Sequence, residues 1–287
     1  MKKQVISALL TGAFVLGTVP MCAFADEPET ITVAATAAPH AEILEEAKPI
    51  LAEMGYDLEI EVFADYVLPN EVVESGEMDA NYFQHINYLN SFNEEQGTHL
   101  VNAGEIHYEP FGIYAGQKAS LDEVADGDTI GVPNDTTNEA RALLLLEAKG
   151  LITLDPEAGI TATPEDITDN PFNLEIEPFE AAQVARHIDE VSYVVLNGNY
   201  ALEAGLNAGT DALAVEAADS DAIQQYVNII TVKEGNENEP KIQALVEVLK
   251  SDEVKAFIEE TWSGAVVPYE VDGAAETEAD IIETEAE

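Results

Sequence analysis

The feature that most constrains the fold is an alternation between short apolar runs and longer amphipathic runs. Residues 129–132 and 193–196 have the composition of buried β-strands, whereas residues 137–149 and 181–191 have that of helices. A further short strand is predicted at residues 174–176. Because parallel strands can be joined only by a long crossover, this order predicts an α/β sheet with helices on both faces. In such sheets, ligands bind beyond the carboxyl ends of the strands.

The N-terminal part of the chain repeats this arrangement. A strand at residues 31–35, a helix at 40–54 that ends at Gly55, and a strand at 58–63 form one strand-helix-strand unit. A helix at residues 86–95 follows, with aromatic and leucine side chains at core spacing. The strands at residues 31–35 and 58–63 are therefore expected to pair in parallel.

A crossing between two lobes is predicted after the extended residues 108–114, at Gly116. The chain is expected to return through a strand at residues 227–232, followed by one helix that Pro240 opens and a last helix that Ser251 caps. The length of 287 residues suits two medium domains. The expected division is lobe 1 at residues 26–115 and 211–268, and lobe 2 at residues 116–210.

One predicted helix carries a candidate anion-binding residue. Residues 134–150 open with side chains that accept hydrogen bonds from free backbone N–H groups, so a helix should begin near residues 136–137 and end at Gly150. Arg141 lies within the first two turns, where the N–H groups and the positive end of the helix dipole favour an anion. Arg141 could bind a carboxylate there, or it could be a solvated side chain or the partner of Glu139.

Polar and aromatic side chains are concentrated at four strand ends or adjacent loops, at residues 65–70, 81–85, 134–141 and 197–200. Asn228 is a fifth candidate, because it interrupts an otherwise apolar strand and a buried asparagine needs hydrogen-bond partners. Each candidate also has a purely structural interpretation. Tyrosine and phenylalanine often belong to a core, and Asn-Gly is a common turn signal.

Composition excludes several partners. Lysine and arginine number 11 against 57 acidic residues, which gives a formal net charge of -46. So strong a negative field repels nucleic acid and anionic lipid but does not repel a small zwitterion. The second of the two arginines, Arg186, is expected to pair with Asp189 or Glu190 on the surface. Residues 269–287 hold eight acids and no base, and they are predicted to be a disordered tail.

The first 25 residues have the pattern of a signal peptide. Two lysines precede an apolar run at residues 5–19, and Ala-Phe-Ala at 23–25 is a cleavage pattern, so the mature chain is expected to be exported. Cys22 is the only cysteine, and no disulfide can form within the chain. A second interpretation makes Cys22 an acylated N-terminus, although Met21 fits a lipoprotein cleavage site poorly.

Five separated segments have distinctive sequences. They are 65–70 (Asp-Tyr-Val-Leu-Pro-Asn), 79–85 (Asp-Ala-Asn-Tyr-Phe-Gln-His), 133–146 (Pro-Asn-Asp with Asn138 and Arg-Ala-Leu-Leu-Leu-Leu), 180–183 (Glu-Ala-Ala-Gln) and 197–201 (Asn-Gly-Asn-Tyr-Ala). In register, these segments resemble the methionine-binding lipoproteins of bacterial ABC importers, the NlpA family. The likeness runs in the same order from Ile31 to Pro268.

This resemblance implies a two-lobed periplasmic-binding-protein fold of type II, with the ligand cleft between the lobes. Such a protein captures methionine and delivers it to the membrane permease of an ABC importer with its ATPase, without a cofactor, a metal or a catalytic residue. The resemblance also implies a location at the cell surface or in the periplasm, with Cys22 as a possible lipid anchor.

The resemblance further implies the roles of individual side chains. Arg141 would grip the ligand carboxylate, and a bidentate arginine suits that planar group. Asn197 and Asn228 would hold the polar ends of the ligand, and aromatic groups at the three remaining positions would surround the thioether. The implied ligand-binding residues are Tyr66, Phe83, His85, Arg141, Asn197 and Asn228.

The sequence disfavours two other classes of function. A metal-binding importer component is disfavoured, because the five histidines include no close-spaced pair of the kind that a preformed site often uses. A secreted hydrolase is disfavoured as well. The sequence has no G-x-S-x-G, H-E-x-x-H or Walker pattern, and Cys22 lies in the signal region.

Overall fold

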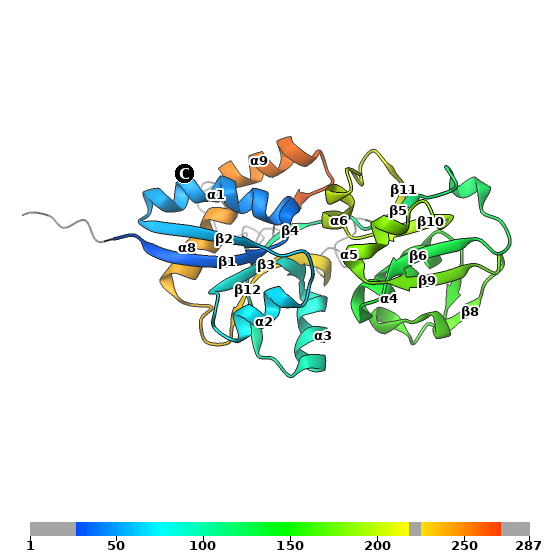
Figure 1. The fold of residues 1–287 in the computed structure, drawn as a ribbon, viewed down its shortest axis with the longest axis horizontal. Helices are drawn as coiled ribbons and strands as arrows, with labels where there is room; N and C mark the ends of the chain where they lie inside the picture. Colours follow the sequence, from blue (N-terminus) through cyan, green and yellow to red (C-terminus); the bar gives the residue numbers. More distant parts are fainter. Residues whose placement is uncertain (1–26, 218–224, 271–287) are drawn as a thin grey trace, which may run out of the picture.

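The computed structural model describes residues 27–217 and 225–270. The chain forms two α/β lobes side by side, one built around each of two sheets (Figure 1). The expected two-lobed α/β architecture is therefore confirmed.

The sheet of the first lobe has the strand order β13-β4-β12-β3-β1-β2 in the described residues. β1 pairs in parallel with β2 and β3, whereas β12 pairs antiparallel with β3 and β4. The strands are β1 (Glu29–Ala35), β2 (Tyr56–Val62), β3 (Ala80–His85), β4 (Leu100–Tyr108), β12 (Val227–Lys233) and β13 (Val267–Pro268).

Helices cover both faces of this sheet because the residues on each face are apolar. On one side Leu44, Leu245 and Ile258 contribute to the main core, and on the other side Val73 and Leu89 form a second cluster. The helical elements are η1 (Ala37–Ala41), α1 (Glu42–Glu53), α2 (Leu68–Glu74), α3 (Ile86–Gln96), α8 (Pro240–Leu249) and α9 (Asp252–Trp262).

The sheet of the second lobe has the strand order β11-β5-β10-β6-β9. Parallel pairs join β6 to β9 and β10, and antiparallel pairs join β5 to β10 and β11. Its elements, with a separate β7-β8 ladder, are β5 (Gly112–Ala115), η2 (Leu121–Glu123), β6 (Thr129–Pro133), α4 (Thr136–Ala148), β7 (Thr153–Leu154), η3 (Gly159–Thr161), η4 (Pro164–Asp166), β8 (Ile167–Asp169), β9 (Glu175–Phe179), α5 (Ala181–Val184), η5 (Ala185–His187), β10 (Tyr193–Leu196), α6 (Gly198–Glu203) and β11 (Ala212–Val215).

The crossings between the lobes differ from the expected boundaries. Strand β5 was assigned to lobe 1, but it pairs with β10 in the second sheet, so the first crossing lies between Tyr108 and Gly112. Strand β11 also belongs to the second sheet, so the chain returns after Val215 rather than at residue 211. Extended segments carry no marker of sheet membership, which is why the sequence misplaced both boundaries.

Most predicted elements are present, and the structure differs from the prediction in three points. β3 was not predicted as a strand, because its six residues are all buried and show no alternation of polar and apolar side chains. The helix predicted at residues 181–191 ends early, as α5 followed by η5. Arg186 is exposed and forms no ion pair with the rest of the described chain, whereas the neighbouring His187 pairs with Glu190 at 2.8 Å.

The predictions about the chain ends lie largely outside the described residues. The signal peptide, Cys22 and residues 271–287 are not covered. Tyr269, which we placed in a disordered tail, donates a backbone hydrogen bond to Ile106 at 2.9 Å. Of the helices in the described part of the chain, none combines the length and apolar character needed to span a bilayer.

Candidate functional site

Helix α4 begins where the sequence predicted. The side chain of Asp135 caps it by accepting a hydrogen bond from the backbone N–H of Asn138 at 3.1 Å, and Gly150 adopts a left-handed conformation just beyond its end. This helix positions Arg141 in the space between the lobes, where the side chain is only 4% exposed.

Contacts on several sides fix the Arg141 guanidinium. Its Nε donates to Oε2 of Glu216 at 3.0 Å, and its Nη2 donates to the backbone oxygen of Glu109 at 3.0 Å and to Oε1 of Glu216. The rings of Phe111 and Tyr226 lie 4.6 and 4.1 Å from its central carbon. Burial lowers the pKa of Arg141, but the Glu216 carboxylate outweighs burial and the pKa is raised.

The pairing with Glu216 corrects the expectation of a bidentate grip on the ligand. The fork made by Nε and Nη2 already holds a carboxylate of the protein. Within the described residues Nη1 forms no hydrogen bond, so this nitrogen of Arg141 remains to receive an anion from the cavity. The acid partner of Arg141 is thus Glu216 rather than Glu139.

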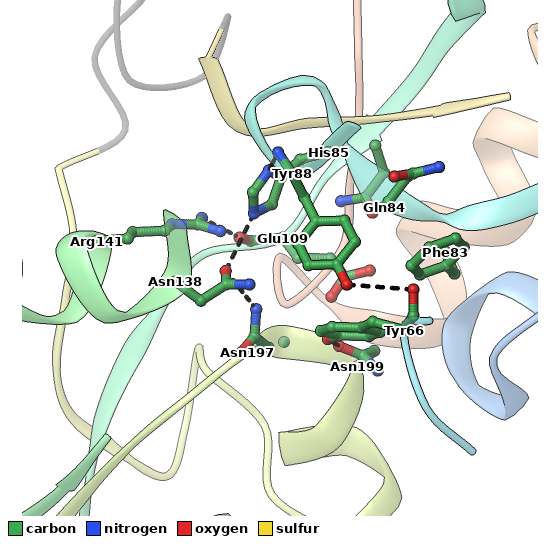
Figure 2. Close-up of a pocket in the computed structure, with 12 residues that line it drawn as sticks. Tyr66, Phe83, Gln84, His85, Tyr88, Glu109, Asn138, Arg141, Asn197 and Asn199 are labelled. Atoms are coloured by element: carbon green, nitrogen blue, oxygen red, sulfur yellow. Dashed lines mark hydrogen bonds between the residues drawn. The ribbon is translucent and has the colours of Figure 1, made fainter. Parts of the chain in front are cut away.

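A chain of amides and imidazole continues from α4 to the other predicted residues (Figure 2). Oδ1 of Asn138 accepts hydrogen bonds from Nε2 of His85 at 3.0 Å and from Nδ2 of Asn197 at 2.8 Å. His85 caps α3, since its Nδ1 accepts the backbone N–H of Tyr88 at 3.1 Å. Nε2 must then carry the hydrogen, and His85 is a neutral donor.

Burial keeps His85 uncharged. Burial and the nearby positive charge of Arg141 lower the pKa of His85 to about 3, against the smaller raising effect of its hydrogen bonds. A neutral His85 places no second positive charge beside Arg141.

Aromatic rings form the opposite wall of the site. Tyr66 lies 5.5 Å from Phe83, 5.5 Å from Tyr88 and 4.9 Å from Tyr200, measured between ring centroids. The Tyr66 hydroxyl donates to Oδ1 of Asn199 at 2.5 Å. Because Tyr66 belongs to the first lobe and Asn199 to the second, this hydrogen bond joins the lobes across the cavity.

Replacing Tyr66 by phenylalanine removes that bond while keeping the ring. A net hydrogen bond is worth about 0.5 to 1.5 kcal/mol, so Tyr66→Phe should weaken ligand binding by about 2- to 12-fold through a less stable closed form. Isothermal titration calorimetry measures this change, with Tyr56→Phe on strand β2 as the matched control. Unaltered affinity in Tyr66→Phe would show that this bond does not support closure.

All six predicted site residues line one cavity between the lobes. These residues come from strand ends, loops and helix starts of both lobes. The most distant pair, Tyr66 and Asn228, is separated by 162 positions in the sequence. The cavity is also lined by residues that were not predicted as ligand contacts, namely Gln84, Tyr88, Glu109, Asn138, Gly198 and Asn199.

Most of the missed residues had a signal in the sequence. Gln84, Asn138, Gly198 and Asn199 lie inside segments that already carried the resemblance, beside residues that were chosen. Glu109 had none, because it stands alone in an extended run among many acids and its burial follows only from the crossing between lobes.

Two buried polar atoms of the site have no protein partner in the described residues. They are Oδ1 of Asn197 and Nδ2 of Asn199. A buried polar group without a partner is costly, so one acceptor and one donor are available to a polar ligand. Asn228, by contrast, has a hydrogen-bond partner, as expected for a buried asparagine, since its Oδ1 lies 3.1 Å from Nε2 of His40.

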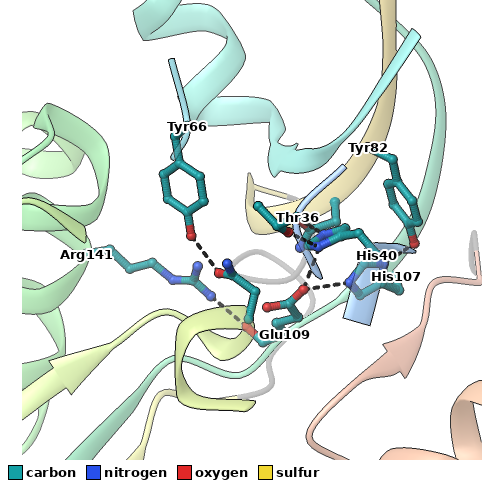
Figure 3. Close-up of polar contacts among 9 residues, drawn as sticks. Thr36, His40, Tyr66, Tyr82, His107, Glu109 and Arg141 are labelled. Carbon is teal, nitrogen blue, oxygen red and sulfur yellow. Dashed lines mark hydrogen bonds and ion pairs between the residues drawn. The ribbon is translucent and has the colours of Figure 1, made fainter. Parts of the chain in front are cut away.

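One group of side chains in the described residues could hold a metal ion. His40, His107 and Glu109 place their ligating atoms within 4.8 Å of one another. The sequence did not indicate this cluster, because its two histidines are 67 positions apart. Their nitrogens are already engaged in hydrogen bonds with Glu109 and neighbouring side chains (Figure 3).

Two α/β lobes with a polar and aromatic cavity between them define the fold of the periplasmic solute-binding proteins. The model of the NlpA lipoprotein family matches residues 31–270, and the chain belongs to this family.

Relatives with known names and structures agree with this assignment. The methionine-binding lipoprotein MetQ of Bacillus subtilis is 43% identical over 276 residues, covering 93% of this chain and 99% of the relative. A crystallised protein of Ruminococcus gnavus is 68% identical with a TM-score of 0.83, covering 84% and 100%. A nutrient-binding protein of Burkholderia cenocepacia, solved bound to methionine, is 38% identical with a TM-score of 0.80, covering 84% and 100%.

Proposed function

We propose that the chain is an extracytoplasmic solute-binding protein that captures methionine and delivers it to an ABC importer. The observation that carries the proposal is the cavity between the lobes, where one anchored arginine faces a set of amides and an aromatic wall. The matching family and the methionine-bound neighbour support the same ligand.

The carboxylate of the ligand is received at Nη1 of Arg141, with Nδ2 of Asn199 as a further donor. Charge-assisted hydrogen bonds of this kind contribute about 1.5 to 3 kcal/mol each in a buried site. Because Glu216 and two aromatic rings already hold the guanidinium in place, little side-chain entropy is lost when the ligand binds.

The side chain of the ligand packs against the aromatic wall of Tyr66, Phe83 and Tyr88. A thioether sulfur beside an aromatic ring gains about 0.3 to 1.5 kcal/mol per contact. Several rings around one position therefore favour methionine over an aliphatic amino acid of similar size.

The proposed role is capture and delivery, without a chemical step. The lobes bind the ligand between them and present the closed form to a membrane permease, which works with an ATPase. The signal pattern supports export to the cell surface or periplasm, and the lipoprotein family supports Cys22 as the lipid anchor, the alternative being cleavage after Ala25.

The test is to identify the ligand and then measure what it stabilises. Mass spectrometry of the small molecule released on denaturation should detect methionine. After the ligand is removed, methionine at about 100 times its dissociation constant should stabilise the protein by about 2.7 kcal/mol. A larger thermal shift with zinc or manganese, or turnover of a methionyl dipeptide, would contradict the proposal.

A further inference from the structure

A buried cluster of two histidines and one glutamate adjoins the cavity through Glu109 (Figure 3). Nε2 of His107 is 2.8 Å from Oε1 of Glu109, and Nε2 of His40 is 3.4 Å from the same oxygen. All three side chains are at most 6% exposed. Of the three, Glu109 alone also lines the cavity.

The hydrogen-bond partners fix where the protons lie. The other nitrogen of His107, Nδ1, contacts the hydroxyl of Tyr82, and Nδ1 of His40 lies 2.8 Å from the hydroxyl of Thr36. When each hydroxyl donates, each Nδ1 accepts and each Nε2 carries the hydrogen. Nε2 of His107 then donates to Glu109, whereas Nε2 of His40 donates to Oδ1 of Asn228 at 3.1 Å and lies beside the carboxylate.

Burial favours this assignment. Burial lowers the pKa of His40 to about 4 and that of His107 to about 3, so both rings are neutral at physiological pH. Burial raises the pKa of Glu109 above its ordinary value, and it outweighs the lowering effects of the Arg141 charge and of a backbone hydrogen bond from Asn199.

The Glu109 carboxylate has no cationic side chain as a partner. In residues 27–217 and 225–270, no lysine or arginine nitrogen lies within 4.0 Å of it, and the charge of Arg141 is already matched by Glu216. Space is reserved for this carboxylate, because a Cβ at Gly198 would lie 2.5 Å from its Oε2. An acceptor that is held in place but lacks a cation is suited to receive one from a ligand.

We propose that Glu109, held by His107 and flanked by His40, receives the α-ammonium of the bound amino acid. This inference rests on the proposed function and specifies its ligand class. With Arg141 binding the carboxylate and Glu109 the amine, the cavity selects a free amino acid with both groups on one carbon. A 2-hydroxy acid, an N-acylated methionine and a peptide that ends in methionine all lack an ammonium on the carbon that bears the carboxylate.

The test compares two ligands that differ only at the amine. Calorimetry with L-methionine and with L-2-hydroxy-4-(methylthio)butanoate should show that the wild type prefers methionine by about 100-fold or more. In Glu109→Gln, methionine affinity should fall by about 10- to 100-fold while the hydroxy acid changes little, because a charge-assisted bond has been lost. The preference should therefore shrink to about 10-fold or less.

Further variants separate a positioning role from a general loss of structure. His107→Leu should reduce the preference for methionine, whereas His107→Gln, which can still donate to Glu109, should restore most of it. Glu105→Gln, on the same strand β4 but outside the cavity, is the matched control. Thermal melting of each variant verifies that it folds.

The outcomes distinguish this inference from the proposed function. If the wild type binds methionine tightly and Glu109→Gln keeps the full preference for the amine, the role of Glu109 is wrong and the proposed function stands. If the wild type binds neither ligand, the proposed function itself fails. Stoichiometric zinc binding that Glu109→Gln abolishes would make the cluster a metal site and overturn the inference.

Discussion

Arg141→Ala is expected to weaken methionine binding by about 100-fold or more, because it removes the N–H donors at Nη1 that face the cavity. The same change should lower the free energy of unfolding by about 3 kcal/mol. Glu216, whose side chain is 11% exposed, would lose its buried counter-ion, and an unpaired buried charge is costly. Titration calorimetry and chemical denaturation measure the two effects separately.

A double variant separates binding from stability. Arg141→Met with Glu216→Gln removes both charges, so it should recover most of the lost stability without recovering affinity. Lys118 and Asp128 form an ion pair remote from the cavity, and Lys118→Met with Asp128→Asn is a matched control that should bind methionine normally. Wild-type affinity in the double variant at Arg141 would contradict the assigned carboxylate site.

Local sequence patterns were sufficient to predict the elements around the site. The cap at Asp135, the four leucines of α4 and the strands β6 and β10 follow from short-range preferences and hydrophobic runs. The fully buried strand β3 had no alternation to reveal it, although the resemblance still identified Phe83 and His85 within it. β6 and β10 are almost completely buried as well, but they are apolar runs, whereas half of the residues of β3 are polar.

The contacts that hold the Arg141 side chain in place could not be predicted from local sequence patterns. Glu216 lies 75 positions from Arg141, and in sequence nothing distinguishes it from the other acidic residues. Its role arises because both crossings between the lobes pass beside α4: Tyr108 donates its hydroxyl to Glu216 at 2.5 Å, and the backbone N–H of Phe111 donates at 2.9 Å. Such partners depend on tertiary packing, so the sequence predicted the arginine but not the carboxylate that aligns it.

Acid pH should destabilise the protein through its buried histidines. The ordinary histidine pKa is 6.5, and folding lowers the pKa of His85 to about 3. Below pH 6.5 the unfolded chain therefore binds more protons than the folded protein does. The contribution of neutral His85 to the free energy of unfolding is complete above pH 6.5 and is lost progressively as the pH falls toward 3. Each pH unit in this window costs about 1.4 kcal/mol per histidine. His40 and His107 act in the same direction.

A difference measurement isolates this effect from the other titrating groups. Burial raises the pKa of Glu109 and Asp135, which opposes the loss, and protonation of the many surface acids reduces repulsion within the chain. Comparing the wild type with His85→Gln by urea denaturation cancels these shared contributions. Between pH 6.5 and 4.5 the wild type should lose about 2.5 kcal/mol more than this variant.

The control is His99→Gln, because the His99 side chain is 70% exposed and folding buries little of it. Its unfolding free energy should follow that of the wild type across the same pH range. If the unfolding free energy of His85→Gln also follows that of the wild type across this pH range, His85 is charged in the folded protein at acid pH. It would then place a second cation beside Arg141, and it could not be the neutral donor that orients Asn138 and, through it, Asn197.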